Sequence, residues 1–374
     1  MQPTRPNFLL VTAISIATLV GGVRADLTFN LNDGPGLVAL QASDIGLYTN
    51  VRNGFLSAAA LWSDRFSDSV TINIAIDYVD LGAGILGQAG STTDAYLYSS
   101  FRSSLIGDAS TPNDLQANSN LPTGPFSMRT NNRDGSVYWD NDGTSNNNYL
   151  ELTNANANAV GLMPANSAGT DASISFSSNF VFDFDRSDGI LFSAYDFIGV
   201  AAHEIGHALG FISGVDSVDF VSGVGPGASL DLNGADPGLG DLQDYAVLTS
   251  LDLFRYSVDS LALGPGVLDN AVSGSPYLST DGGATNLGGF STGRFNGDGG
   301  QASHWLDGSN LGMMNPTLSN GQFLTFSQFD LIAFDTIGWD LKPTAVPEPA
   351  STVLIITTLI FVRCKRESRR DKLK

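Results

Sequence analysis

The sequence predicts an α+β fold that combines a mixed, twisted sheet with a long central helix and a C-terminal part ending in a helix. Residues 70–81 alternate apolar and polar side chains, as a strand with one buried face does. Residues 193–211 and 325–337 instead repeat their apolar side chains at helical spacing. The chain has 374 residues, of which 42% are hydrophobic, so it is long enough to bury a sizeable core.

The other elements of the N-terminal half follow from the same patterns. A helix is expected over residues 44–66, which end in LSAAALWSDRF. The alternating segments 172–177 (ASISFS) and 179–185 (NFVFDFD) predict strands at a sheet edge. The polar, Asn-rich residues 131–158 are typical of loops and turns.

The central helix carries signals at both of its ends. Ser193, with Asp196 three residues later, resembles a capping box, and Gly210 can end the helix. The following residues 214–300 are rich in Gly and Asp, which predicts long loops. One further helix is expected near residues 241–256.

The charge balance is strongly acidic, with 38 Asp and Glu against 18 Lys and Arg and a net charge of −20. Such a surface repels phosphate backbones, so we expect no nucleic-acid partner. The acidity fits solubility outside the cell. Alternatively, clustered oxygen ligands bind Ca²⁺ as a second cofactor, although neither cluster follows the EF-hand loop pattern. These clusters are Asp140, Asn141 and Asp142, and Asp231, Asn233 and Asp236.

The N-terminal residues 1–25 have the pattern of a secretory signal. Arg5 supplies the positive start, and residues 8–20 form a mostly apolar run that is short for a membrane anchor. Val23-Arg24-Ala25 resembles a small-x-Ala cleavage site, which predicts cleavage after Ala25 and export of the chain.

The C-terminal residues 346–374 contain a different three-part pattern. Val346 is followed by Pro347, Glu348 and Pro349, then by the uncharged run 351–362 and the basic tail 363–374. Twelve helical residues cover only about 18 Å of a hydrocarbon core of about 30 Å. The lone cysteine, Cys364, lies in this tail, so the preceding domain has no disulfide and no thiolate metal ligand.

This pattern resembles the bacterial PEP-CTERM sorting signal. The resemblance implies transient insertion in the inner membrane, cleavage near Pro347 by a sorting peptidase of the exosortase type, and release to the cell surface or extracellular matrix. An ordinary tail anchor is the alternative. The chain would then divide into a signal peptide, a main domain over residues 26–345, and the sorting signal.

A possible metal site stands on the central helix. His203 and His207 are four residues apart and therefore project from one helical face, where two neutral imidazoles can bind one zinc ion. Glu204 completes an H-E-x-x-H arrangement, in which the glutamate takes a proton from water as general base. The chain has only 3 His, so chance produces this pattern rarely.

A catalytic zinc usually has three protein ligands, and two candidates for the third remain open. The later glutamates, Glu348 and Glu367, both lie in the sorting tail. His304 is the one remaining histidine. Its rival is Asp216, just past the helix, because a carboxylate oxygen is also an acceptable zinc ligand.

The motifs resemble those of the metzincin metalloproteases, which have H-E-x-x-H-x-x-G-x-x-H and a later methionine turn. Ser213 stands where this motif has its third histidine. The leishmanolysin-like branch has that histidine after an insertion, in a Ser-His-Trp context followed by a Met-containing turn. The matching residues here are His203, Glu204, His207 and Gly210, then Ser303-His304-Trp305 and Met313-Met314-Asn315-Pro316.

The resemblance implies His304 as the third ligand and Met314 as the turn methionine beneath the metal. It also implies a metzincin-like catalytic domain, with an N-terminal subdomain to about residue 212 and a C-terminal subdomain over 213–345. The expected function is an exported zinc metalloendopeptidase, a hydrolase of protein or peptide substrates, in which strand 179–185 offers its edge to the substrate.

Two other classes of function remain as alternatives. A non-enzymatic matrix or adhesion protein with a degenerate site would have no need of Glu204. A purely structural zinc would require a closed shell of four ligands, for which the main domain has three histidines and no cysteine.

Overall fold

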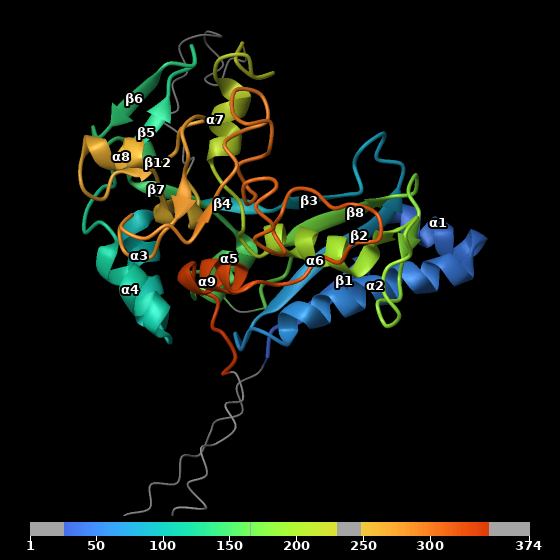
Figure 1. The fold of residues 1–374 in the computed structure, drawn as a ribbon. Coiled ribbons are helices and arrows are strands. Elements are labelled where there is room, and N and C mark those ends of the chain that lie inside the picture. Colours follow the sequence, from blue (N-terminus) through green and yellow to red (C-terminus); the bar gives the residue numbers. More distant parts are fainter. Residues whose placement is uncertain (1–25, 165, 230–247, 344–374) are drawn as a thin grey trace, which may run out of the picture.

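The computed structural model describes residues 26–164, 166–229 and 248–343 (Figure 1). The predicted signal peptide with Ala25 lies outside the described residues. So do Pro347, Glu348, Pro349 and the rest of the sorting signal, and the acidic cluster of Asp231, Asn233 and Asp236.

A four-stranded mixed sheet forms the N-terminal half, which confirms the predicted α+β class. Its strand order is β1-β2-β8-β3; the first three strands are parallel and β3 is antiparallel to β8. The bounds are β1 Thr28–Asp33, β2 Thr71–Val79, β8 Ala172–Ser177 and β3 Gly87–Ser91. The alternation expected of residues 70–81 is present, because Ile72, Ile74 and Ile76 are buried on one face of β2.

Three helices pack with this sheet: α1 Pro35–Ser43, α2 Ile45–Ser63 and α6 Phe197–Ala208. Figure 1 shows α2 and α6 running alongside one another. Phe55 of α2 contacts Phe176 and Phe197 edge to face, with ring centroids 5.2 and 5.4 Å apart. The buried Trp62 indole donates to the carbonyl oxygen of Ala202 at 2.9 Å, so α2 holds α6 by packing and by a hydrogen bond.

Two predicted elements near α6 need correction. The helix begins after Asp196, whose side chain caps it by accepting from the Gly199 N–H at 3.0 Å, so Ser193 is not the cap. The reason is that β10, Tyr195–Asp196, pairs in parallel with β9, Phe182–Asp183. Only those two residues of segment 179–185 form a strand, and β8 lies inside the main sheet rather than at its edge.

The prediction of loops and turns for residues 131–158 is right for residues 132–136 and 141–144 and wrong for most of the rest. This segment holds β6 Val137–Asp140, the short 3₁₀ helix η1 Ser145–Asn147, β7 Tyr149–Thr153 and α5 Asn154–Ala159. Strand pairing overrides the polar composition: β7 pairs with the distant β4, Thr93–Leu97, and β6 pairs with the adjacent β5, Met128–Asn131.

The C-terminal half is built from short elements around long connections. Strand β12 pairs in parallel with β5, so segments from both sides of residue 212 share one sheet. Figure 1 shows β5, β6, β12 and α8 together at the end of the molecule away from α1. The bounds are α3 Tyr98–Asp108, α4 Pro112–Asn120, α7 Val215–Val221, η3 Leu251–Phe254, β11 Arg255–Tyr256, α8 Val258–Leu263, β12 Leu268–Asp269, β13 Tyr277–Leu278, β14 Gly288–Gly289 and α9 Gln328–Thr336.

Two helical predictions for this half have different outcomes. The final helix over 325–337 is confirmed as α9, whose N-cap is Ser327 in a capping box with Asp330. The described part of the helix expected near 241–256 is instead η3 followed by β11, so that prediction is wrong there. Among the described residues no helix is long and apolar enough to span a membrane.

Candidate metal centre

Helix α6 presents His203 and His207 to the floor of a cleft of about 1250 Å³. The third histidine, His304, enters the same cleft from the long connection before α9. His203 and His304 are buried and His207 is partly buried. The structure thus brings His304 together with His203 and His207, the two histidines whose spacing in the sequence indicated a metal site.

The three Nε2 atoms converge on one point. The Nε2 of His203 is 3.1 Å from that of His207 and 3.1 Å from that of His304, and His207 and His304 are 3.2 Å apart. Among the described residues, this is the group of His, Cys, Asp or Glu side chains whose ligand atoms lie close enough together to hold a metal ion. Asp216 does not belong to the group.

Backbone carbonyls set the tautomer of each ring. The Nδ1 of His203 faces the Met313 oxygen at 2.8 Å, that of His207 faces the Phe211 oxygen at 2.8 Å, and that of His304 faces the Gln301 oxygen at 3.2 Å. A carbonyl oxygen only accepts, so each Nδ1 carries the proton and donates it. Each Nε2 therefore directs a lone pair at the same point, an arrangement that a cation stabilises.

Burial keeps all three rings neutral at pH 7. It lowers the pKa of His203 to about 4 and that of His207 to about 3, and repulsion from a protonated His203 contributes to the lower pKa of His207. It also lowers the pKa of His304 well below its usual range. The neutral imidazole is the form that binds metals, so protons compete weakly for this site.

Glu204 lies beside the histidines in the cleft, next to β3. A β-carbon on Gly87 would lie 3.3 Å from the Glu204 Cγ and 3.3 Å from its Oε1, so the carboxyl packs against the backbone of the edge strand. Burial raises the pKa of Glu204 to about 8. A carboxyl group in this position can take and return a proton near neutral pH.

Met314 packs against α6 at Gly206, which lies between His203 and His207 in the sequence. Its sulfur would be 2.5 Å from a β-carbon on Gly206, and its side chain is fully buried. The preceding Met313 supplies the carbonyl that orients His203. The turn at 313–314 therefore supports the histidine cluster through packing and through a hydrogen bond.

Asp330 holds this turn, and the sequence patterns did not single it out. Its fully buried carboxylate accepts from the N–H groups of Met313 at 2.8 Å and Met314 at 3.2 Å. It also accepts from the Trp305 indole at 2.8 Å and the Ser327 N–H at 2.7 Å. The capping box at Ser327 was a local signal for Asp330, but the contacts with the turn and with Trp305 are distant in sequence.

Asp216, the rival third ligand, is committed elsewhere. Its Oδ1 accepts from the Ala302 N–H at 2.7 Å, and its Oδ2 accepts from the Ser303 N–H at 3.0 Å. These are the two residues that precede His304. The carboxylate therefore contacts the chain that carries the ligand rather than the point where the histidines meet.

The predicted calcium cluster over residues 140–142 is also occupied by contacts within its own loop. Asp140 accepts from the Asn146 amide at 2.8 Å, and Asp142 accepts from the Thr144 hydroxyl at 2.7 Å. In the described part of the chain these acids do not belong to a group of three or more His, Cys, Asp or Glu side chains whose ligand atoms lie together.

Comparisons of the chain with protein-family models, with curated proteins and with solved structures found no match. The geometry of the site is therefore the basis for its proposed function.

Proposed function

We propose that the chain is an exported, zinc-dependent endopeptidase of the metzincin type. One observation carries the proposal: three neutral imidazoles, from His203, His207 and His304, direct their lone pairs at one point on the floor of an open cleft that Glu204 also lines. Substrate-sized access and a nearby carboxyl group distinguish this arrangement from a buried structural metal site.

The donor set favours zinc. Three imidazole nitrogens with no thiolate and no carboxylate suit a tetrahedral site whose fourth position stays open to water or substrate. Zinc bound there supplies Lewis-acid chemistry, because it acidifies water and polarises a carbonyl group. A structural zinc would have a closed shell of four protein ligands, which the three histidines do not complete.

Glu204 is the proposed general base. Its carboxylate accepts a proton from the attacking water, and the resulting acid then donates that proton to the leaving amine. Burial makes Glu204 a stronger base than an exposed carboxylate, because it raises the pKa of the group.

The substrate would lie along β3 rather than along segment 179–185. Strand β3 pairs with β8 on one side and ends the order of the main sheet. Gly87, Gln88 and Ala89 of this strand line the cleft. An extended peptide could pair with the free edge of β3, which places its backbone beside Glu204.

The test compares the full-length chain with its Glu204→Gln variant. We expect both proteins to bind about one zinc ion and only the native one to cleave casein, with a loss of at least 100-fold in the variant. Removal of the metal with a chelator should abolish cleavage, and re-added zinc should restore it only in the native chain. Equal cleavage by the variant would disprove the role of Glu204. A native protein that binds no zinc would favour the matrix-protein alternative.

A further inference from the structure

Ser213 stands at the position where the compact metzincin motif has its third histidine. In this chain His304 is the proposed third ligand, and Ser213 contacts Ser303, the residue before it. The Ser213 N–H donates to the Ser303 Oγ at 2.9 Å. Ser303 directly precedes His304 in the chain, 90 residues after Ser213. The turn after α6 therefore supplies no ligand itself but touches the segment that does.

Asp216, in the first turn of α7, extends this contact. Its two oxygens accept from the N–H groups of Ala302 and Ser303 at 2.7 and 3.0 Å, and the Ser303 hydroxyl donates to its Oδ2 at 2.5 Å. One carboxylate thus receives three hydrogen bonds from two consecutive residues. Hydrogen bonds to an ionised acceptor are the stronger and more directional kind.

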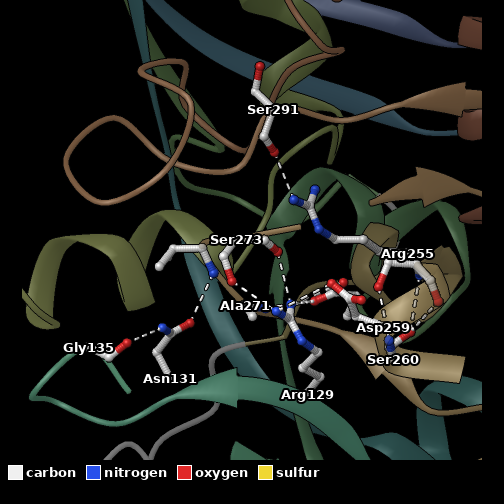
Figure 2. Close-up of polar contacts among 12 residues, drawn as sticks. Arg129, Asn131, Gly135, Arg255, Asp259, Ser260, Ala271, Ser273 and Ser291 are labelled. Carbon is white, nitrogen blue, oxygen red and sulfur yellow. Dashed lines mark hydrogen bonds and ion pairs between the residues drawn. The ribbon is translucent and has the colours of Figure 1, made fainter. Parts of the chain in front are cut away.

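Two further buried side chains, Asp252 and Arg255, hold the two segments that meet in this contact. Asp252 of η3 accepts from the Ser213 hydroxyl at 2.6 Å and from the Gly214 N–H at 2.7 Å, which fixes the turn. Arg255 donates to the Ser291 carbonyl at 2.7 Å, as Figure 2 shows. The Ser291 N–H in turn donates to the carbonyl oxygen of His304 at 3.1 Å.

From these contacts we propose that Asp216 is the positioning residue of the third metal ligand. The inference rests on the proposed metal site and deepens it: the turn 213–216 is a docking site for residues 302–303, and this docking aims His304 at the two helical histidines. A ligand held in place before the metal binds loses less conformational freedom on binding, so Asp216 raises the affinity for the metal.

A merely structural role would consist of keeping the long connection between α6 and His304 folded. Asp219 offers a matched control for that role. It lies on the same helix, is buried, and accepts from the N–H groups of Phe295 at 2.8 Å and Asn296 at 2.7 Å. Asp219 therefore binds the same connection between α6 and His304, but at residues 295–296, which are farther along the chain from His304 than residues 302–303 are.

The experiment measures the zinc dissociation constant of the full-length native chain, Asp216→Asn and Asp219→Asn by competition with a chromophoric chelator. An asparagine at 216 has one acceptor oxygen in place of two, so its amide N–H₂ faces either the Ala302 N–H or the Ser303 donors and one side of the contact is lost. We expect Asp216→Asn to weaken zinc binding about 10- to 100-fold, and Asp219→Asn to stay within about twofold of native, even where both lower the melting temperature. Cobalt substituted for zinc should show an altered visible spectrum in Asp216→Asn alone.

Unchanged zinc affinity and an unchanged cobalt spectrum in Asp216→Asn would overturn the proposal. Equal losses in the two variants would also overturn it, since they would reduce Asp216 to a structural role. If Asp216→Asn fails to fold, Ser303→Ala decides, because it removes the hydroxyl and keeps the backbone donors; weaker zinc binding supports the proposal and native affinity refutes it. Because the readout is metal binding, a native chain that binds zinc but cleaves nothing would refute only the endopeptidase function.

Discussion

The sulfur of Met314 fills the space that a β-carbon on Gly206 would need, at 2.5 Å from that position. Gly206 lies between His203 and His207 on α6, so the helix approaches the turn at 313–314 closely only because this residue has no side chain. The close approach of the turn to the helix that carries both ligands therefore depends on glycine at this position.

Replacement of Gly206 by alanine should lower stability. In an open helical position the change would stabilise by about 1 kcal/mol, because alanine favours the helix. Here the added methyl group meets Met314, and overpacking costs about 1–3 kcal/mol. Urea unfolding of Gly206→Ala measures the sign. The double variant with Met314→Ala should lose less stability than the two single changes added together, and simple additivity would contradict the contact.

Asp330→Asn should weaken the hydrogen bonds that hold both the turn at 313–314 and Trp305, the residue after His304. The two oxygens of Asp330 each accept from two donors, and an asparagine would turn an N–H₂ group toward one of these pairs. A buried donor left without an acceptor costs about 1–3 kcal/mol. We expect a lower melting temperature and quenching changes in Trp305 fluorescence, and native stability would refute the role assigned to this carboxylate.

How far the sequence predicts this structure depends on how local each signal is. Helices α2 and α9 and strand β2 were predicted correctly because their apolar periodicity lies within the element itself. The start of α6 was misplaced because Asp196 is held by the pairing of β10 with β9, which the local pattern does not contain. Strand β7 was missed for the same reason, since its partner β4 overrides an Asn-rich composition.

The residues of the site also differ in how local their sequence signals are. His203, Glu204 and His207 could be identified from spacing, and His304 from its motif context. Asp330 could not be predicted, because its donors lie at 305, 313, 314 and 327 and meet only in the folded chain. The edge position of β3 is likewise a property of the whole sheet.

Zinc should stabilise the folded chain strongly, because the histidine cluster forms only on folding. A ligand present at 1,000 times its dissociation constant adds about 4 kcal/mol to the free energy of unfolding. The melting temperature of chelator-treated protein should therefore rise on addition of zinc. His203→Ala should abolish most of this rise, and a full rise in that variant would place the zinc elsewhere.

The contribution of Asp68 to stability should fall as the pH rises. Burial, with the neighbouring charges of Asp340 and Asp108, raises the pKa of Asp68 to about 8. Between the ordinary pKa of about 4 and this value, the folded chain binds a proton that the unfolded chain has lost, so each step up in pH favours unfolding. Asp68→Asn should flatten this slope and stabilise the protein at pH 8. An unchanged slope in urea unfolding from pH 5 to 8 would contradict this assignment.

Strand β3 provides the sharpest test of the cleft, because two of its glycines differ in surroundings. A β-carbon on Gly87 would lie 3.3 Å from Glu204, whereas one on Gly90 would meet no heavy atom within 4 Å. Gly87→Ala should displace the Glu204 carboxyl by a few tenths of an ångström and lower casein cleavage about tenfold, since catalysis is sensitive to small misplacements. Zinc content should stay at the native level, because the three atoms nearest to the added methyl group belong to Glu204 and Phe176. Gly90→Ala adds the same methyl group to the same strand and should cleave casein at the native rate. Equal activity of the two variants would show that β3 does not position Glu204.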